Sequence, residues 1–212
     1  MKKYMNSNSL KLKLVSSFLP IALFANCIAY NENLLQKPAP LDPATIAPTK
    51  PKVFLKSSFQ VFSSGVPTPA HPAFQDNWNK AIQNKIKIVG IFADLTETET
   101  AADYKLEVIV EDRGEANVAL AVLTGLTLYL FPSTASDHFK VTLNVADKKG
   151  NKLGTVIKEE KIVLWQQILL LFGLPFLFPP SVAKQAQNDL LDAIFVEAYH
   201  QGYFSKDKPK KK

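Results

Sequence analysis

This 212-residue sequence contains side chains that could carry out acid–base or metal chemistry. They do not have the spacing that such chemistry needs. The histidines His71, His138 and His200 lie far apart and show no paired spacing of metal ligands. Ser136-Asp137-His138 has the residue types of a catalytic triad, but triads are assembled from distant positions and not from consecutive ones. The sequence therefore predicts no metal site and no catalytic triad.

A polar stretch between two predicted strands carries four acids, Asp94, Glu97, Glu99 and Asp103. Paired carboxylates can act as a general acid and base or bind a cation, but acids interleaved with threonines are more typical of a solvated loop. The sequence also lacks a glycine-rich phosphate-binding loop. We therefore expect a protein that is not an enzyme and that binds no cofactor.

The strongest nucleophile in the chain is its sole cysteine, Cys27, because a thiolate is soft enough to take a thioether-linked lipid. Residues 14–26 before it are largely apolar, and this run is far shorter than the roughly 20 residues that a membrane-spanning helix needs. The positions ahead of the run hold no acid and four lysines, Lys2, Lys3, Lys11 and Lys13. We predict that residues 1–26 are a signal peptide.

The end of this segment, Leu23-Phe24-Ala25-Asn26-Cys27, resembles the lipobox of bacterial lipoproteins. The resemblance implies cleavage before Cys27 and attachment of a lipid anchor, with fatty acids such as palmitate, to its sulfur. Ile28, and not an aspartate, follows the cysteine, so the inner-membrane retention signal common in lipoproteins is missing and the resemblance implies the outer membrane. We expect the periplasmic face, with exposure on the cell surface as the alternative. The alternative is an ordinary signal peptide that is cut after Ala29 and discarded together with Cys27.

The net charge of +6 comes from the two ends of the chain. Residues 1–26 carry four lysines and no acid, and the final residues 206–212 carry five lysines and one aspartate. Residues 27–205 are therefore slightly acidic, at −2, which excludes the basic surface of a nucleic-acid-binding protein. We expect residues 205–212 to be a disordered tail whose Lys208–Lys212 could contact anionic lipid. With one cysteine, packing and not a disulfide must hold the fold.

Residues 27–52 contain five prolines, Pro38, Pro40, Pro43, Pro48 and Pro51. Proline at this density disfavours helices and central strands and favours an extended, solvated chain. Such a segment would reach on the order of 70 Å at about 3.1 Å per residue. We therefore expect a proline-rich tether that begins at the lipidated cysteine and holds the folded part away from the membrane.

Hydrophobic patterning predicts one α+β domain over residues 53–204. An interrupted strand over 53–62 is followed by an amphipathic helix over 72–85 and a short strand over 86–92. Alternating strands are expected at 104–111 and 139–145, with a hairpin turn at 147–151 and a return strand to 164. A last helix begins with Ser181 as its cap. We expect an antiparallel sheet of four to five strands with two main helices on one face.

Ala102-Asp103-Tyr104-Lys105-Leu106 resembles a strand of envelope lipoproteins related to the curli-export lipoprotein. The order of the predicted elements is also similar to that of the amino-terminal domain of the Tol propeller protein. These resemblances imply an α+β fold over Val53–Phe204 and a role in binding other envelope proteins. They carry no catalytic residue over to this chain.

Two apolar segments, Val118–Phe131 and Ile162–Phe178, are the most unusual feature of the sequence. As helices they would measure about 21 and 26 Å, which is less than the hydrocarbon core of a bilayer. Continuous apolar runs are most often buried core, so we expect these segments to be core; a groove for a partner or lipid and a membrane-surface contact remain open. The candidate partner or ligand surface is Trp165, Leu169, Phe172, Phe176, Leu177 and Phe178.

Two hypotheses of function follow. The first is a non-catalytic envelope lipoprotein that is anchored through Cys27 and acts as a protein-binding or assembly factor. The second is a lipoprotein that binds a lipid or small ligand in an apolar pocket built from residues 118–131 and 162–178. Both have a membrane as a partner through the N-terminal lipid, and the first adds an envelope protein.

Overall fold

The computed structural model describes residues 27–46, 48–173 and 176–204. The predicted signal peptide over 1–26 and the basic tail over 205–212 lie outside the described residues. The strands are β1 (Cys27–Asn31), β2 (Lys52–Ser63), β3 (Val66–Thr68), β4 (Asp94–Thr96), β5 (Tyr104–Ala116), β6 (Ser133–Asp147) and β7 (Lys152–Gln166). The helices are α2 (Pro72–Ile88), α3 (Val118–Leu126) and α4 (Pro179–His200), with short 3₁₀ turns η1 (Pro43–Thr45), η2 (Glu99–Ala101) and η3 (Ile168–Gly173).

The strands form a mixed sheet in the order β1-β7-β6-β5-β2-β3, with β4 paired to β2 beside this path. The α+β class is as predicted, but the sheet has seven strands, which is more than the expected four to five. The purely antiparallel pairing was wrong, because β2 runs parallel to both β4 and β5. Parallel neighbours need a crossover, and α2 provides it by returning the chain between β2 and β4.

Contacts group the described residues into two compact units, which we call unit 1 and unit 2. Unit 1 comprises residues 27–30, 116–135 and 163–182, apart from 174–175. Unit 2 comprises residues 31–115, 136–162 and 183–204, apart from 47. The single domain expected over residues 53–204 stays a prediction beside this grouping. None of the described helices is long and apolar enough to cross a membrane.

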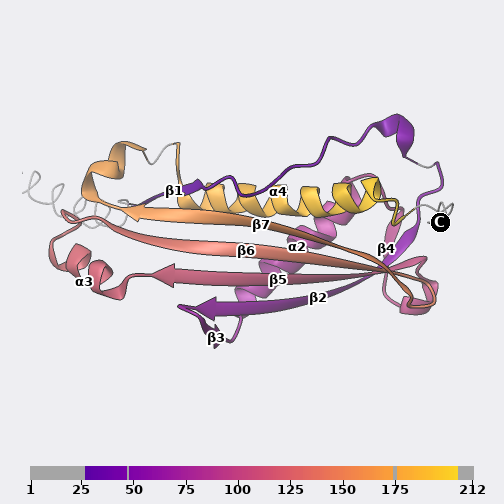
Figure 1. The fold of residues 1–212 in the computed structure, drawn as a ribbon, viewed down its shortest axis with the longest axis horizontal. Helices are drawn as coiled ribbons and strands as arrows, with labels where there is room; N and C mark the ends of the chain where they lie inside the picture. The colour runs from indigo at the N-terminus through magenta and orange to yellow at the C-terminus, as the bar shows by residue number, and fades with distance from the viewer. Residues whose placement is uncertain (1–26, 47, 174–175, 205–212) are drawn as a thin grey trace, which may run out of the picture. The chain divides into compact units, whose positions relative to one another are not determined.

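The core of unit 2 lies between the sheet and the helices α2 and α4, which Figure 1 shows on the same face of β5 and β6. The predicted alternation on β5 is confirmed, since the side chains on one face of the strand are buried: Tyr104, Leu106, Val108 and Val110. The predicted last helix is present as α4, and its side chains at four-residue spacing in unit 2 are buried: Ala186, Leu190, Ile194 and Ala198. Alternation and helical spacing therefore identified both sides of this core.

Helix α2 extends beyond its predicted end. His71 caps its first turn, with Nδ1 accepting from the Ala73 amide at 3.2 Å, and Pro72 occupies the first helical position. The strand expected over residues 86–92 was wrong. Ile86 continues the four-residue spacing of Trp78 and Ile82, and its burial in the same core keeps the chain helical to Ile88.

The segment after Cys27 differs most from its prediction. Residues 27–31 form strand β1, and the chain that follows is bonded to unit 2 instead of being a free tether. The buried Glu160 carboxylate accepts from the Leu34 amide at 3.1 Å, and Lys37 pairs with Asp189 at 2.8 Å. Prolines exclude a helix or an inner strand, but they leave the remaining amides and side chains free to bond to the domain.

Candidate functional site

Unit 1 contains no charged side chain. Its described residues, 27–30, 116–135, 163–173 and 176–182, include no Asp, Glu, Lys, Arg or His. Charged residues make up 21% of the whole chain. All the charged residues that the structure describes belong to unit 2. A surface segment of this size normally carries charge, and its absence sets unit 1 apart as a candidate site.

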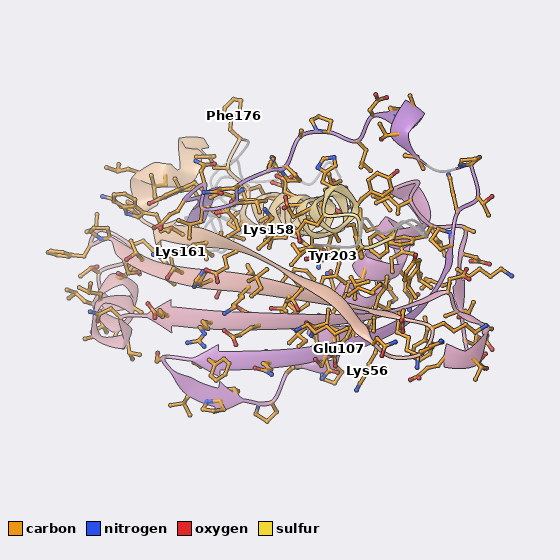
Figure 2. All side chains as sticks on the ribbon, turned by 45° about the vertical axis from the view of Figure 1, so that its right-hand side comes forward. Lys56, Glu107, Lys158, Lys161, Phe176 and Tyr203 are labelled. Carbon is orange, nitrogen blue, oxygen red and sulfur yellow. The ribbon has the colours of Figure 1, made fainter. Side chains whose placement is uncertain are left out.

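The apolar side chains of unit 1 are exposed. Phe176 is 84% exposed and Leu126 is 79% exposed, and the Phe176 ring points outward in Figure 2. The exposed large apolar residues of this unit are Tyr30, Val118, Leu120, Val122, Leu123, Leu126, Leu128, Leu130, Phe131, Trp165, Leu169, Phe176 and Phe178. The expectation that both apolar segments are core was therefore wrong. In helix α3 the only buried residue is Thr124, and the large apolar side chains of the helix face outward, so an apolar run alone did not reveal whether the helix is covered.

Hydrogen bonds hold the two apolar segments of unit 1 together. The Ile168 amide donates to the Tyr129 carbonyl at 2.9 Å, and the Ser133 hydroxyl donates to Gln166 Oε1 at 3.1 Å. Leu128 and Tyr129 adopt positive φ angles of 51° and 65°, which turn the chain back after α3. Hydrogen bonds between the two segments therefore hold the exposed apolar side chains in a defined arrangement.

Cys27 belongs to the same unit. Its strand is fixed by the Ala29 amide, which donates to the Leu177 carbonyl at 3.0 Å. Burial raises the pKa of the Cys27 thiol, while a hydrogen bond with Gln166 opposes the rise. The half-buried thiol is therefore less prone to ionise than a free cysteine, which limits its reactivity once the protein has folded.

The predicted surface residues are brought together in this unit. Trp165, Leu169, Phe176 and Phe178 are exposed, Leu177 is half-buried, and the side chain of Phe172 lies outside the described residues. Two open pockets, of about 340 and 500 Å³, are lined by residues of unit 2 alone. Neither contains a residue of the segments 118–131 and 162–178, from which the alternative ligand pocket was predicted.

Two of the acids considered for chemistry have structural partners. Glu99 pairs with Lys105 at 2.6 Å, and Asp103 accepts from the Lys52 amide at 2.9 Å. His138 lies 3.3 Å from Glu159. Within the part of the chain that the structure describes, no three His, Cys, Asp or Glu side chains group as metal ligands.

A carboxyl pair that sequence reasoning missed lies on neighbouring strands of unit 2. Burial raises the pKa of Asp112 to about 7, and the Asp137 carboxylate adds to the rise. Burial also raises the pKa of Asp137. Asp112 Oδ1 is buried and has no hydrogen-bond partner in the structure. The alternation on β5 could have indicated this position, because Asp112 follows Val108 and Val110 on the inward face.

We expect this pair to make the stability depend on pH. The folded protein keeps a proton on Asp112 that the unfolded chain has released, so the free energy of unfolding should fall as the pH rises from about 4 to about 7. Asp112→Asn, a neutral residue of the same shape, should be more stable than the wild type at pH 8 and show a smaller pH slope. Urea denaturation at pH 5 and pH 8 measures both quantities. The exposed Asp76→Asn serves as the control, and identical slopes in wild type and Asp112→Asn would contradict the assignment.

Comparisons with models of protein families and with curated protein sequences give no match. Solved structures similar to this chain include a protein described as a neuraminyllactose-binding hemagglutinin homolog from Helicobacter pylori, with 11% identity over 81% of this chain and 92% of that chain and a TM-score of 0.41. A minor lipoprotein from Acinetobacter baumannii has 15% identity over 73% and 90%, with a TM-score of 0.33. A PelC dodecamer from Paraburkholderia phytofirmans has 13% identity over 79% and 97%, with a TM-score of 0.32. At these values, function has to be argued from the residues of this chain.

Proposed function

We propose that this protein is a non-catalytic, lipid-anchored component of a bacterial envelope that binds another envelope protein. The observation that carries the proposal is the position of Cys27, the sole cysteine, in a unit without charged residues. A lipid on this sulfur would lie among exposed apolar side chains and not among charged ones. The signal-peptide pattern before Cys27 and the lipobox resemblance support the same assignment.

Unit 2 offers the surface for a protein partner. On β5, Lys105 and Glu107 alternate with buried residues and therefore face away from α2 and α4. This face carries polar pairs across strands, with Lys56 3.8 Å from Glu107 and Glu107 accepting from Asn144 at 3.1 Å. Figure 2 shows Lys56 and Glu107 as neighbours. Paired charges of this kind favour recognition of a specific protein surface more than binding of a small apolar ligand.

The lipid anchor is tested by labelling growing cells with an alkyne analogue of palmitate. We expect the wild-type protein to take the label and to fractionate with the outer membrane, and Cys27→Ser to take none, because no other thiol exists in the chain. Purification of the labelled protein from detergent-solubilised envelope should also retain a protein partner. Equal labelling of both forms, or of neither, would overturn the assignment of Cys27.

A further inference from the structure

The composition of unit 1 identifies what covers its apolar surface. Protein–protein interfaces keep polar and charged residues at their rim, and even obligate interfaces are only partly apolar. The exposed surface of unit 1 has no charged residue on either of its segments, 116–135 and 163–182. An environment that excludes charge altogether is the hydrocarbon region of a bilayer, where ionised side chains carry a high free-energy cost.

Three hydroxyl side chains of unit 1 are bonded in a way that suits such an environment. The Thr124 hydroxyl donates to the Leu120 carbonyl at 2.8 Å, and the Thr127 hydroxyl donates to the Leu123 carbonyl at 2.8 Å. The Ser181 hydroxyl donates to the Phe178 carbonyl at 2.7 Å. A hydroxyl that is bonded to its own chain can enter an apolar medium without losing a partner, whereas an unbonded one cannot.

The dimensions of unit 1 limit how deeply it can enter. Helix α3 has nine residues, or about 14 Å of helix, which is less than half of a hydrocarbon core. Segments of this kind lie at the boundary between headgroups and acyl chains. Trp165, which is 39% exposed, is an aromatic residue of the type that occupies this boundary.

We infer that unit 1 seats in the surface of a phospholipid bilayer, with the exposed apolar side chains of residues 118–131, 165–169 and 176–178 among the acyl chains beside the lipid on Cys27. This inference rests on the proposed lipid anchor, which brings the bilayer to the unit that contains Cys27. It adds to the lipid a second contact of the same protein with the bilayer, made by apolar side chains of the unit that contains Cys27.

The two tryptophans of the chain allow a direct test. Trp165 is exposed in unit 1, whereas Trp78 is 4% exposed in the core of unit 2. The acylated protein, verified by its intact mass, is reconstituted into vesicles of phosphatidylethanolamine and phosphatidylglycerol with plain or brominated acyl chains. We expect brominated lipid to quench the tryptophan emission of the wild type but not of Trp165→Phe, which retains only the shielded Trp78.

A charge-insertion pair provides the matched control. The double variant Leu169→Glu, Phe176→Glu places acids on exposed positions of unit 1 and should lose the quenching while remaining anchored by its lipid. Ile88→Glu, at a 72% exposed apolar position of unit 2, should keep it. Circular dichroism checks that each variant is folded.

The outcomes separate this inference from the proposed function. An acylated protein whose Trp165 emission is equal in plain and brominated vesicles overturns the seating and leaves the anchor intact. If Trp165 is also shielded from aqueous acrylamide in that case, a second protein copy covers the surface instead. A protein that carries no acyl group overturns the proposed anchor itself.

Discussion

Phe195→Ala is expected to lower the free energy of unfolding by about 3–5 kcal/mol, or the melting temperature by roughly 6–20 °C. Phe195 is fully buried on α4 and is the largest of the fully buried side chains. Its ring meets Phe92 edge-to-face at 5.9 Å, and Phe92 in turn meets Phe204 at 4.9 Å. Alanine would leave a cavity in the core and remove the edge-to-face contact with Phe92.

Phe176→Ala is the matched control, since it makes the same chemical change at a side chain that is 84% exposed. We expect its melting temperature to stay within about a degree or two of the wild type, as for surface substitutions in general. Thermal melting of both variants in the same detergent compares them directly. A loss of stability in Phe176→Ala as large as in Phe195→Ala would show that unit 1 is core after all.

Leu106→Ala is expected to cost about 2–5 kcal/mol. Leu106 is 1% exposed in the middle of the buried face of β5 and pairs in register with Leu55 of the parallel strand β2. Removing its branched side chain takes packing from the centre of the core, where both helices and the sheet meet. Urea denaturation should show a lower midpoint with an unchanged slope.

Lys105→Ala, one residue earlier on the same strand, should change stability little. Its ammonium group contacts Glu99 at 2.6 Å on the opposite face, and a partly exposed ion pair contributes about 0–1 kcal/mol. Similar destabilisation by Leu106→Ala and Lys105→Ala would mean that the assignment of the two faces of β5 is incorrect.

Sequence patterns predicted the parts of the fold that depend on interactions between residues close together in the chain. The alternation at Tyr104 and Leu106 identified β5, and the spacing of Trp78 and Ile82 identified α2, because side-chain periodicity follows directly from backbone geometry. The parallel pairing of β2 with β5 was missed, since it depends on contacts between residues about fifty positions apart. The end of α2 was also missed, because Ile86 fits a strand as well as a helical stripe.

The candidate site was only partly visible in the sequence. The apolar runs and Cys27 indicated the right segments. A run of apolar residues has the same sequence pattern, however, whether it faces a protein core or a bilayer. The bonding of residues 31–45 to unit 2 was missed for a different reason. Its key contacts, such as Leu34 with Glu160, join positions that are distant in sequence, whereas the prolines that suggested a tether act on the chain locally.

The bonded path from Asn31 to Thr45 determines how far from Cys27, the proposed attachment point, the protein could reach a partner. Only three residues lie between Cys27 and Asn31, a span of at most about 14 Å, whereas a free proline-rich linker would let the folded part move through a much larger volume around Cys27. With the proposed lipid on Cys27 and so short a connection, encounters with the proposed partner would depend on lateral diffusion within the plane of the membrane. Tethering of this kind raises the local concentration of partners in the same membrane, whereas proteins farther from the membrane than the connection allows cannot be bound.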